Sequence, residues 1–183
     1  MNILHSSING LTVVETTPYE DERGAFARLY CEQELSDLIG HRRIQQINYS
    51  RTSSVGAVRG MHYQHYPHAE MKLVRCIKGS VWDVAVDLRF QSPTFLKWYA
   101  EELTPTNNRM MVIPEGFAHG FQVLKPDSEI LYIHTAFYAP NSEVGLRHDD
   151  PMLGVKWPIA VTDLSKRDAE HPFMDSNFQG VCL

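Results

Sequence analysis

The chain has 183 residues, 43% of them hydrophobic, and its 22 acidic residues exceed its 17 basic residues to give a formal net charge of −5. This length predicts a single domain over residues 1–183, and the lack of a basic run argues against a nucleic-acid or membrane partner. No segment approaches the ~18 apolar residues of a membrane span, and three widely spaced cysteines argue against a disulfide framework. We therefore expect a cytoplasmic protein.

Short β-like segments recur along the chain, separated by turn signals such as KGS, SPT, PEG and KPDS. The predicted strands are 11–16, 24–30, 43–50, 71–77, 80–88, 94–103, 109–113, 120–124 and 129–138. Apolar spacing predicts a short helix over 31–40, and a second one over 162–172 with Thr162 or Ser165 as its N-cap. Closely spaced strands with few helices predict an antiparallel barrel or sandwich.

The segment 59-RGMHYQHYPHAEMK-72 concentrates three histidines, a glutamate and a lysine on what reads as one hairpin. Such a cluster fits either a metal site or a proton-transfer site. The metal site of a cupin pairs an H-x-H motif and a glutamate with a later P-x-G-x-x-H motif. The chain supplies the later motif as 114-PEGFAH-119, which ends in His119.

The first half of the metal motif fails on spacing. Strand side chains alternate faces, so two ligands of one ion need an even spacing. His62 and His65 are three residues apart and would point to opposite faces unless a bulge intervenes. The ammonium of Lys72 would also repel a divalent cation. The sequence therefore favours a site that holds no metal.

Proton transfer fits the same residues better. Histidine exchanges a proton near neutral pH, and a nearby lysine such as Lys72 can stabilise an enolate oxygen. In the strand 129–138 the residues Tyr132, His134 and Tyr138 share one face because their spacing is even. A base and a cation on one wall, with weak acids on another, suit proton movement beside a carbonyl group.

Several ungapped runs resemble the dTDP-4-dehydrorhamnose 3,5-epimerase family, in the same order, over residues 10–170. They are 21-DERGAF-26, 59-RGMHYQ-64, 72-KLVRCIKGSVWDVAVDLR-89, 92-SPTF-95, 113-IPEGFAHGF-121, 138-YAP-140, 149-DDPMLGVKWP-158 and 164-LSKRD-168. The resemblance implies an all-β, cupin-like double-stranded β-helix (jelly roll) that forms a homodimer and needs no metal or other cofactor. It also implies inversion of C3 and C5 in a nucleotide-linked 4-keto-6-deoxyhexose, a step of dTDP-rhamnose biosynthesis.

By motif position, the resemblance also implies roles for individual residues. His62 corresponds to the base, Asp168 to the residue that orients it, Lys72 to the enolate stabiliser and Tyr132 to the acid that reprotonates from the other face. The residues that resemble the shell around the nucleotide and sugar are Arg23, Phe26, Arg28, Gln46, Asn48, Arg59, His119 and Tyr138. Arginines suit diphosphate oxygens and aromatic faces suit a pyrimidine base.

Four positions depart from the family pattern: Arg28 replaces a common glutamate, Ile47 a frequent aspartate, Glu70 a usual glutamine and His148 a usual tryptophan. Nucleotide identity and inversion at both carbons therefore stay open. The alternatives are an epimerase of the same family that acts on C3 only or on another nucleotide, a metal-dependent cupin enzyme, and a non-catalytic sugar-nucleotide binding module. The joint presence of the four catalytic candidates argues against the binding module.

Overall fold

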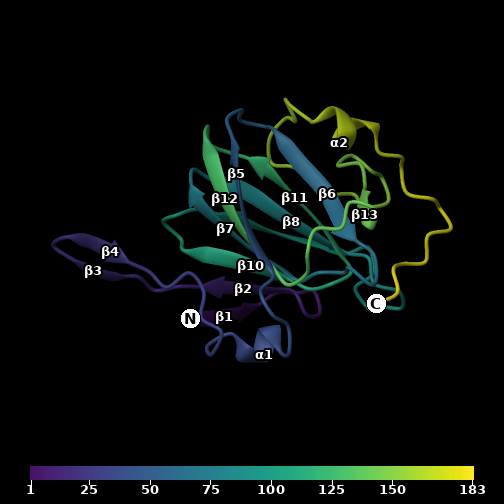
Figure 1. The fold of residues 1–183 in the computed structure, drawn as a ribbon. Coiled ribbons are helices and arrows are strands. Elements are labelled where there is room, and N and C mark those ends of the chain that lie inside the picture. Colours follow the sequence, from purple (N-terminus) through teal and green to yellow (C-terminus); the bar gives the residue numbers. More distant parts are fainter.

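The computed structural model describes residues 1–183 and consists mainly of two antiparallel sheets that face each other (Figure 1). The larger sheet has six strands, in the spatial order β1 (Asn2–His5), β2 (Thr12–Glu15), β10 (Arg109–Ile113), β7 (Lys72–Lys78), β12 (Ser128–His134) and β5 (Gln46–Thr52). The second sheet has five strands, in the order β13 (Glu143–Gly145), β6 (Val58–Gln64), β11 (Phe117–Val123), β8 (Val81–Asp87) and β9 (Trp98–Leu103). The predicted antiparallel all-β architecture is confirmed.

A small hairpin and two short helices complete the structure. The hairpin consists of β3 (Tyr19–Asp21) and β4 (Gly24–Phe26) and extends away from the two sheets, at the left of Figure 1. Helix α1 (Ser36–Ile39) lies beside β1, and α2 (Lys166–Glu170) lies near the first half of β6. Neither helix has the length and apolar character needed to cross a membrane.

The main core lies between the two sheets because each sheet buries one apolar face. Val74, Met111 and Ile130 of the six-stranded sheet belong to the same buried cluster as Val81 and Phe121 of the five-stranded sheet. Burying a side chain of this size stabilises a fold by about 1.5–3 kcal/mol. A second cluster covers the outer face of the larger sheet, where α1 packs.

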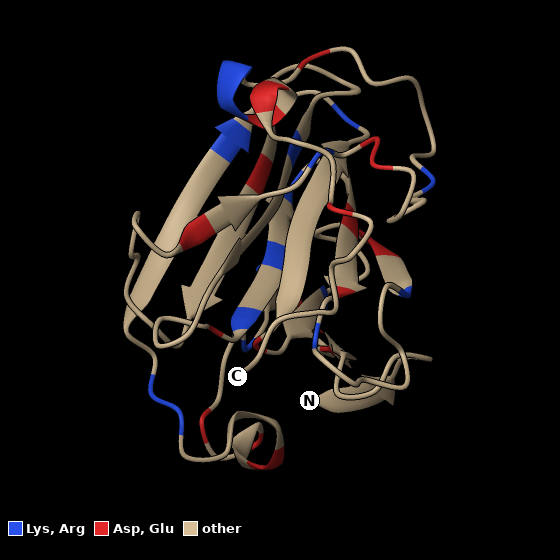
Figure 2. Ribbon diagram, turned by 90° about the vertical axis from the view of Figure 1, so that its right-hand side faces the viewer, with Lys and Arg blue, Asp and Glu red and all other residues tan.

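Charged residues are spread over both sheets. Basic and acidic segments are interspersed along the strands and loops in Figure 2. This distribution matches the balanced composition of the sequence, and it gives no support to a polyanionic partner.

The structure corrects several of the predicted elements. The predicted strand 129–138 ends at His134, because His134 pairs with the first residues of both neighbouring strands, Gln46 and Lys72. The predicted helix 31–40 is helical only over Ser36–Ile39. The second helix does begin after Ser165, whose side chain accepts a hydrogen bond from the backbone N–H of Asp168.

The segment 59–72 is not one hairpin. Its first part is β6 in the five-stranded sheet, and its last residue begins β7 in the other sheet. Strand β6 was absent from the predicted strands because Gly60 interrupts its apolar pattern. Gly60 has a φ of 117°, and a Cβ there would lie 2.6 Å from the Cα of Gly120 in the neighbouring strand. The strand therefore needs glycine at this close approach.

Candidate active site

A cavity of about 760 Å³ lies between the sheets and collects most of the predicted site residues. The predicted residues in its lining are Gln46, Asn48, Arg59, His62, Lys72, His119, Tyr132, Tyr138 and Asp168. The lining draws on strands of both sheets and on α2. Residues more than a hundred positions apart in the chain therefore share one space.

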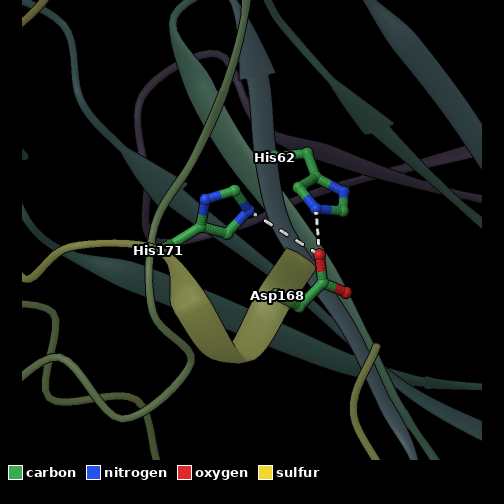
Figure 3. A group of neighbouring side chains, drawn as sticks. All are labelled: His62, Asp168 and His171. Atoms are coloured by element: carbon green, nitrogen blue, oxygen red, sulfur yellow. Dashed lines mark hydrogen bonds and ion pairs between the residues drawn. The ribbon is translucent and has the colours of Figure 1, made fainter. Parts of the chain in front are cut away.

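The shortest polar contact of His62 in this cavity joins it to Asp168. His62 Nε2 lies 2.7 Å from Asp168 Oδ1, and Asp168 is only 3% exposed. Figure 3 shows the two side chains directed at each other. The backbone N–H of Gly60 donates to the other oxygen, Oδ2, at 3.4 Å. Burial by itself raises the pKa of the Asp168 carboxyl, but its hydrogen bond with His62 and the other donors bring that pKa below its usual value.

This contact defines the chemistry of the imidazole. A carboxylate only accepts hydrogen bonds, so His62 Nε2 must carry the proton that is donated to Asp168. The lone pair of the neutral ring is then on Nδ1. His62 is thus arranged as a base whose charged form, once it gains a proton, is stabilised by Asp168.

Tyr132 contributes a phenol from the opposite sheet. Its hydroxyl lies 3.0 Å from the hydroxyl of Ser50, and its ring stacks on His134 with a centroid distance of 6.0 Å. Burial raises the pKa of the Tyr132 phenol well above its usual range. The phenol therefore stays protonated at neutral pH and can serve as an acid.

Lys72 belongs to a buried network at the same sheet. Its ammonium lies 3.1 Å from Glu70 Oε1, and the other oxygen of Glu70 lies 2.7 Å from His134 Nδ1. Burial raises the pKa of the Glu70 carboxyl, yet hydrogen bonding to His134 and the charge of Lys72 bring it below its usual value. Glu70 is therefore an anion that holds the Lys72 ammonium in place.

His119 forms a second imidazole–carboxylate pair in the cavity. His119 Nε2 lies 2.7 Å from Oδ1 of Asp83, which is fully buried. Sequence reasoning missed Asp83, although a signal existed. Asp83 falls between Val81 and Ala85, two residues of the main core, and a buried carboxylate at such a position needs a hydrogen-bond partner.

Sequence reasoning also missed Glu70 and His171 as site residues. Glu70 was noted as the glutamate of the 59–72 cluster and as a departure from the family pattern, but it was given no role in the site. His171 carried no signal, because its position beside Asp168 results from the path of the chain after α2. The ligand atoms of His62, Asp168 and His171 lie within 4.8 Å of one another and could in principle hold a metal ion. However, the Arg167 guanidinium lies 3.1 Å from His62 Nε2, and its positive charge opposes a divalent ion there.

Three predicted substrate-binding residues lie outside the cavity of their own chain. Arg23 and Phe26 belong to the projecting hairpin, where the Arg23 side chain is 84% exposed and Phe26 is 76% exposed. Arg28 follows the hairpin and forms an ion pair with Glu34. These three residues therefore do not reach the cavity of their own chain, because the hairpin extends away from the two sheets (Figure 1). Their role in substrate binding stays a prediction.

Comparison with known proteins agrees with this geometry. The model of the family described as dTDP-4-dehydrorhamnose 3,5-epimerase matches residues 5–176. The chain belongs to this family. It is 40% identical over 177 residues to the dTDP-4-dehydrorhamnose 3,5-epimerase of Salmonella typhimurium, a match that covers 96% of each chain. The prediction of an isomerase of this family is thereby confirmed.

Solved structures of the family confirm the predicted cupin-like jelly roll. One is the dTDP-6-deoxy-D-glucose-3,5-epimerase from Legionella pneumophila in complex with dTDP-4-keto-L-rhamnose, with a TM-score of 0.91 and 37% identity over 100% of this chain and 98% of the other. Another is a 3′-monoepimerase from Streptomyces bikiniensis in complex with dTDP-quinovose, with a TM-score of 0.87 and 30% identity over 93% of this chain and 86% of the other. The epimerase thus has relatives that act on C3 alone.

Proposed function

We propose that this epimerase converts dTDP-4-dehydro-6-deoxyglucose to dTDP-4-dehydrorhamnose by inverting C3 and C5. The observation that carries the proposal is the arrangement of acid and base in the cavity. The paired His62 and Asp168 approach from the five-stranded sheet and α2, and the protonated Tyr132 approaches from the six-stranded sheet. A substrate between the sheets meets a base on one side and an acid on the other.

The first half of the reaction removes a proton. C3 and C5 are both bonded to the C4 carbonyl carbon, so the C–H bond of each is acidified by the ketone. His62 Nδ1 takes the proton, and the electron pair of the C–H bond moves into the carbonyl to form an enolate. Asp168 stabilises the resulting imidazolium, and the Lys72 ammonium stabilises the enolate oxygen.

The second half returns a proton to the opposite face. The Tyr132 hydroxyl donates its proton to the carbon, the enolate returns to the ketone, and the configuration at that carbon is inverted. Solvent then reprotonates the phenolate, and the proton on His62 passes to solvent. The same pair can serve both carbons, since each is adjacent to the same ketone.

Incubation with dTDP-4-dehydro-6-deoxyglucose in deuterated water tests this proposal. We expect deuterium at both C3 and C5 of the inverted product, read by NMR. Label at C3 alone would assign the activity of the monoepimerase relatives instead. We also expect exchange to survive exhaustive chelation, because the proposed steps use only protein side chains. Loss of exchange on chelation, with recovery on adding a metal, would support the metal-dependent alternative.

We further propose that the β3–β4 hairpin completes the active site of a second copy of the chain. The hairpin exposes Tyr19 and Phe26, and a two-stranded ribbon with exposed aromatic side chains gains stability by packing on another surface. The Arg23 guanidinium, which binds Asp21 at 2.6 Å, is suited to a diphosphate. A homodimer that exchanges hairpins would bring the predicted residues Arg23 and Phe26 to the nucleotide.

Mixed dimers test the exchange of hairpins. We expect Arg23→Ala/Phe26→Ala and His62→Ala each to be deficient alone, and dimers formed by co-expressing the two to regain activity. In such a dimer, the intact hairpin of the His62→Ala chain would complete the site that holds the intact base. If each hairpin served its own chain, no site in the mixed dimer would be complete and activity would stay low.

A further inference from the structure

A second imidazole lies beside the proposed base and approaches the same oxygen of the Asp168 carboxylate. His171 directly follows α2, and its Nε2 lies 3.7 Å from Asp168 Oδ1, the same oxygen that accepts from His62. The two rings meet edge to face, with centroids 5.9 Å apart and an interplanar angle of 79°. Figure 3 shows both rings directed at this one oxygen.

The Nε2 nitrogen of His171 lacks a hydrogen-bond partner. Nε2 is buried and makes no hydrogen bond, and Asp168 is the only acid with an oxygen within 4.0 Å of it. A buried N–H without an acceptor destabilises a fold, because it has lost its hydrogen bonds to water without gaining a new one. A shift of the ring toward the carboxylate would satisfy it.

The glycine at position 145 leaves room for the His171 ring. Gly145 of β13 pairs with His62 of β6, and a Cβ added to Gly145 would lie 1.9 Å from His171 Nε2. The ring fits beside Asp168 only because residue 145 has no side chain. The imidazole is thus held between β13 and the carboxylate, with little freedom to turn away.

We propose that His171 is a positioning residue that acts on the base through Asp168. His171 donates a second N–H to the Asp168 carboxylate, and His62 therefore stays neutral, and able to accept a proton, down to lower pH. The inference rests on the proposed function, in which His62 removes the proton. An anion that accepts from two donors has less charge to offer to each of them. A second donor on Asp168 therefore weakens the stabilisation of protonated His62.

The surroundings of His171 favour its neutral, donating form. The titratable and charged groups that face it are His62 on β6, Arg167 and Asp168 on α2, and Glu143 on β13. Burial lowers the pKa of His171, and the nearby His62 lowers it further, while Asp168 and Glu143 act in the opposite direction. At neutral pH the ring is therefore uncharged and can share Asp168 without adding a positive charge.

Two substitutions separate this role from packing. His171→Phe keeps a ring but removes the donor, whereas His171→Gln keeps an N–H donor. In the Phe variant, we expect the acidic limb of the pH profile for deuterium exchange at C3 to move up by about 0.5–1 pH unit. Exchange near pH 6 should then be about 3–10-fold slower than in the wild type. The two exchange rates should approach each other toward pH 8. The Gln variant should keep the wild-type limb. His68→Phe, which replaces an exposed histidine, is the matched control.

Gly145→Ala tests the same contact from the other side. Its methyl group displaces the His171 ring, so it should shift the limb as His171→Phe does and add nothing when the two are combined. An equal loss of exchange rate at every pH in the Phe, Gln and Ala variants would show that His171 only packs.

NMR titration of the His62 Cε1–H should show the same shift without any substrate. If His62→Ala itself retains exchange, His62 is not the base and the proposed mechanism fails. An unmoved limb together with an inactive His62→Ala variant overturns only the role of His171.

Discussion

We expect His62→Ala to abolish deuterium exchange at both C3 and C5, because one imidazole is proposed to start both inversions. A positioned acid–base group contributes about 10²-fold or more to the rate, so exchange should fall by at least that factor. His62→Asn should be nearly as impaired, since an amide has no basic nitrogen. Asp168→Asn should lose less, because it removes the orientation and charge support of the base but leaves the base itself.

The measurement is label at each carbon by NMR, with circular dichroism to verify that each variant is folded. Substantial exchange in His62→Ala would move the role of the base elsewhere. His119 would be the first candidate, because it lines the same cavity and has its own carboxylate partner, Asp83, at 2.7 Å.

Tyr132→Phe separates removing a proton from delivering one. The variant keeps the ring, which stacks on His134, and loses only the hydroxyl, which contacts Ser50. His62 and Lys72 can still form the enolate and return deuterium from the original side. We expect label to enter the substrate while the inverted product falls by about 10²-fold or more.

Two rates measured in one experiment test this expectation: label in recovered substrate and formation of inverted product. Tyr99→Phe is the control, because it removes a phenol from β9 outside the cavity, where it is bonded to Glu101. If Tyr132 only packs the core, its phenylalanine variant will invert as fast as wild type. Tyr138 would then be the next residue to test, although its hydroxyl is already bonded to Glu143 at 3.0 Å.

Much of the local structure could be predicted because it depends on neighbours in the chain. Alternation placed Tyr132 and His134 on one face of their strand, and the structure has both in the cavity lining. Ser165 was identified as a possible cap from its residue type alone, and it does accept from Asp168 N–H. The family motifs identified the reaction class, since several ungapped runs in order are specific to one family.

The boundaries of elements were predicted less well because partners set them. The strand predicted over 129–138 stops at His134, where both neighbouring strands begin. The helix predicted over 31–40 shortens to one turn, which buries Ile39 against the larger sheet. The local sequence determines neither boundary, because each boundary depends on where another segment of the chain begins or packs.

The sequence by itself determined the all-β class, most of the strands and the family, and it supplied the candidates for the reacting groups. Only the tertiary structure decided which of these groups meet. It separates His62 and Lys72 onto opposing sheets, joins His62 to Asp168 across 106 positions of the chain, and brings His171 to the same carboxylate oxygen. It also moves Arg23 and Phe26 away from their own cavity. The physical reason is that local sequence sets the face of a strand on which a side chain lies, whereas sheet order and chain path set what that face meets.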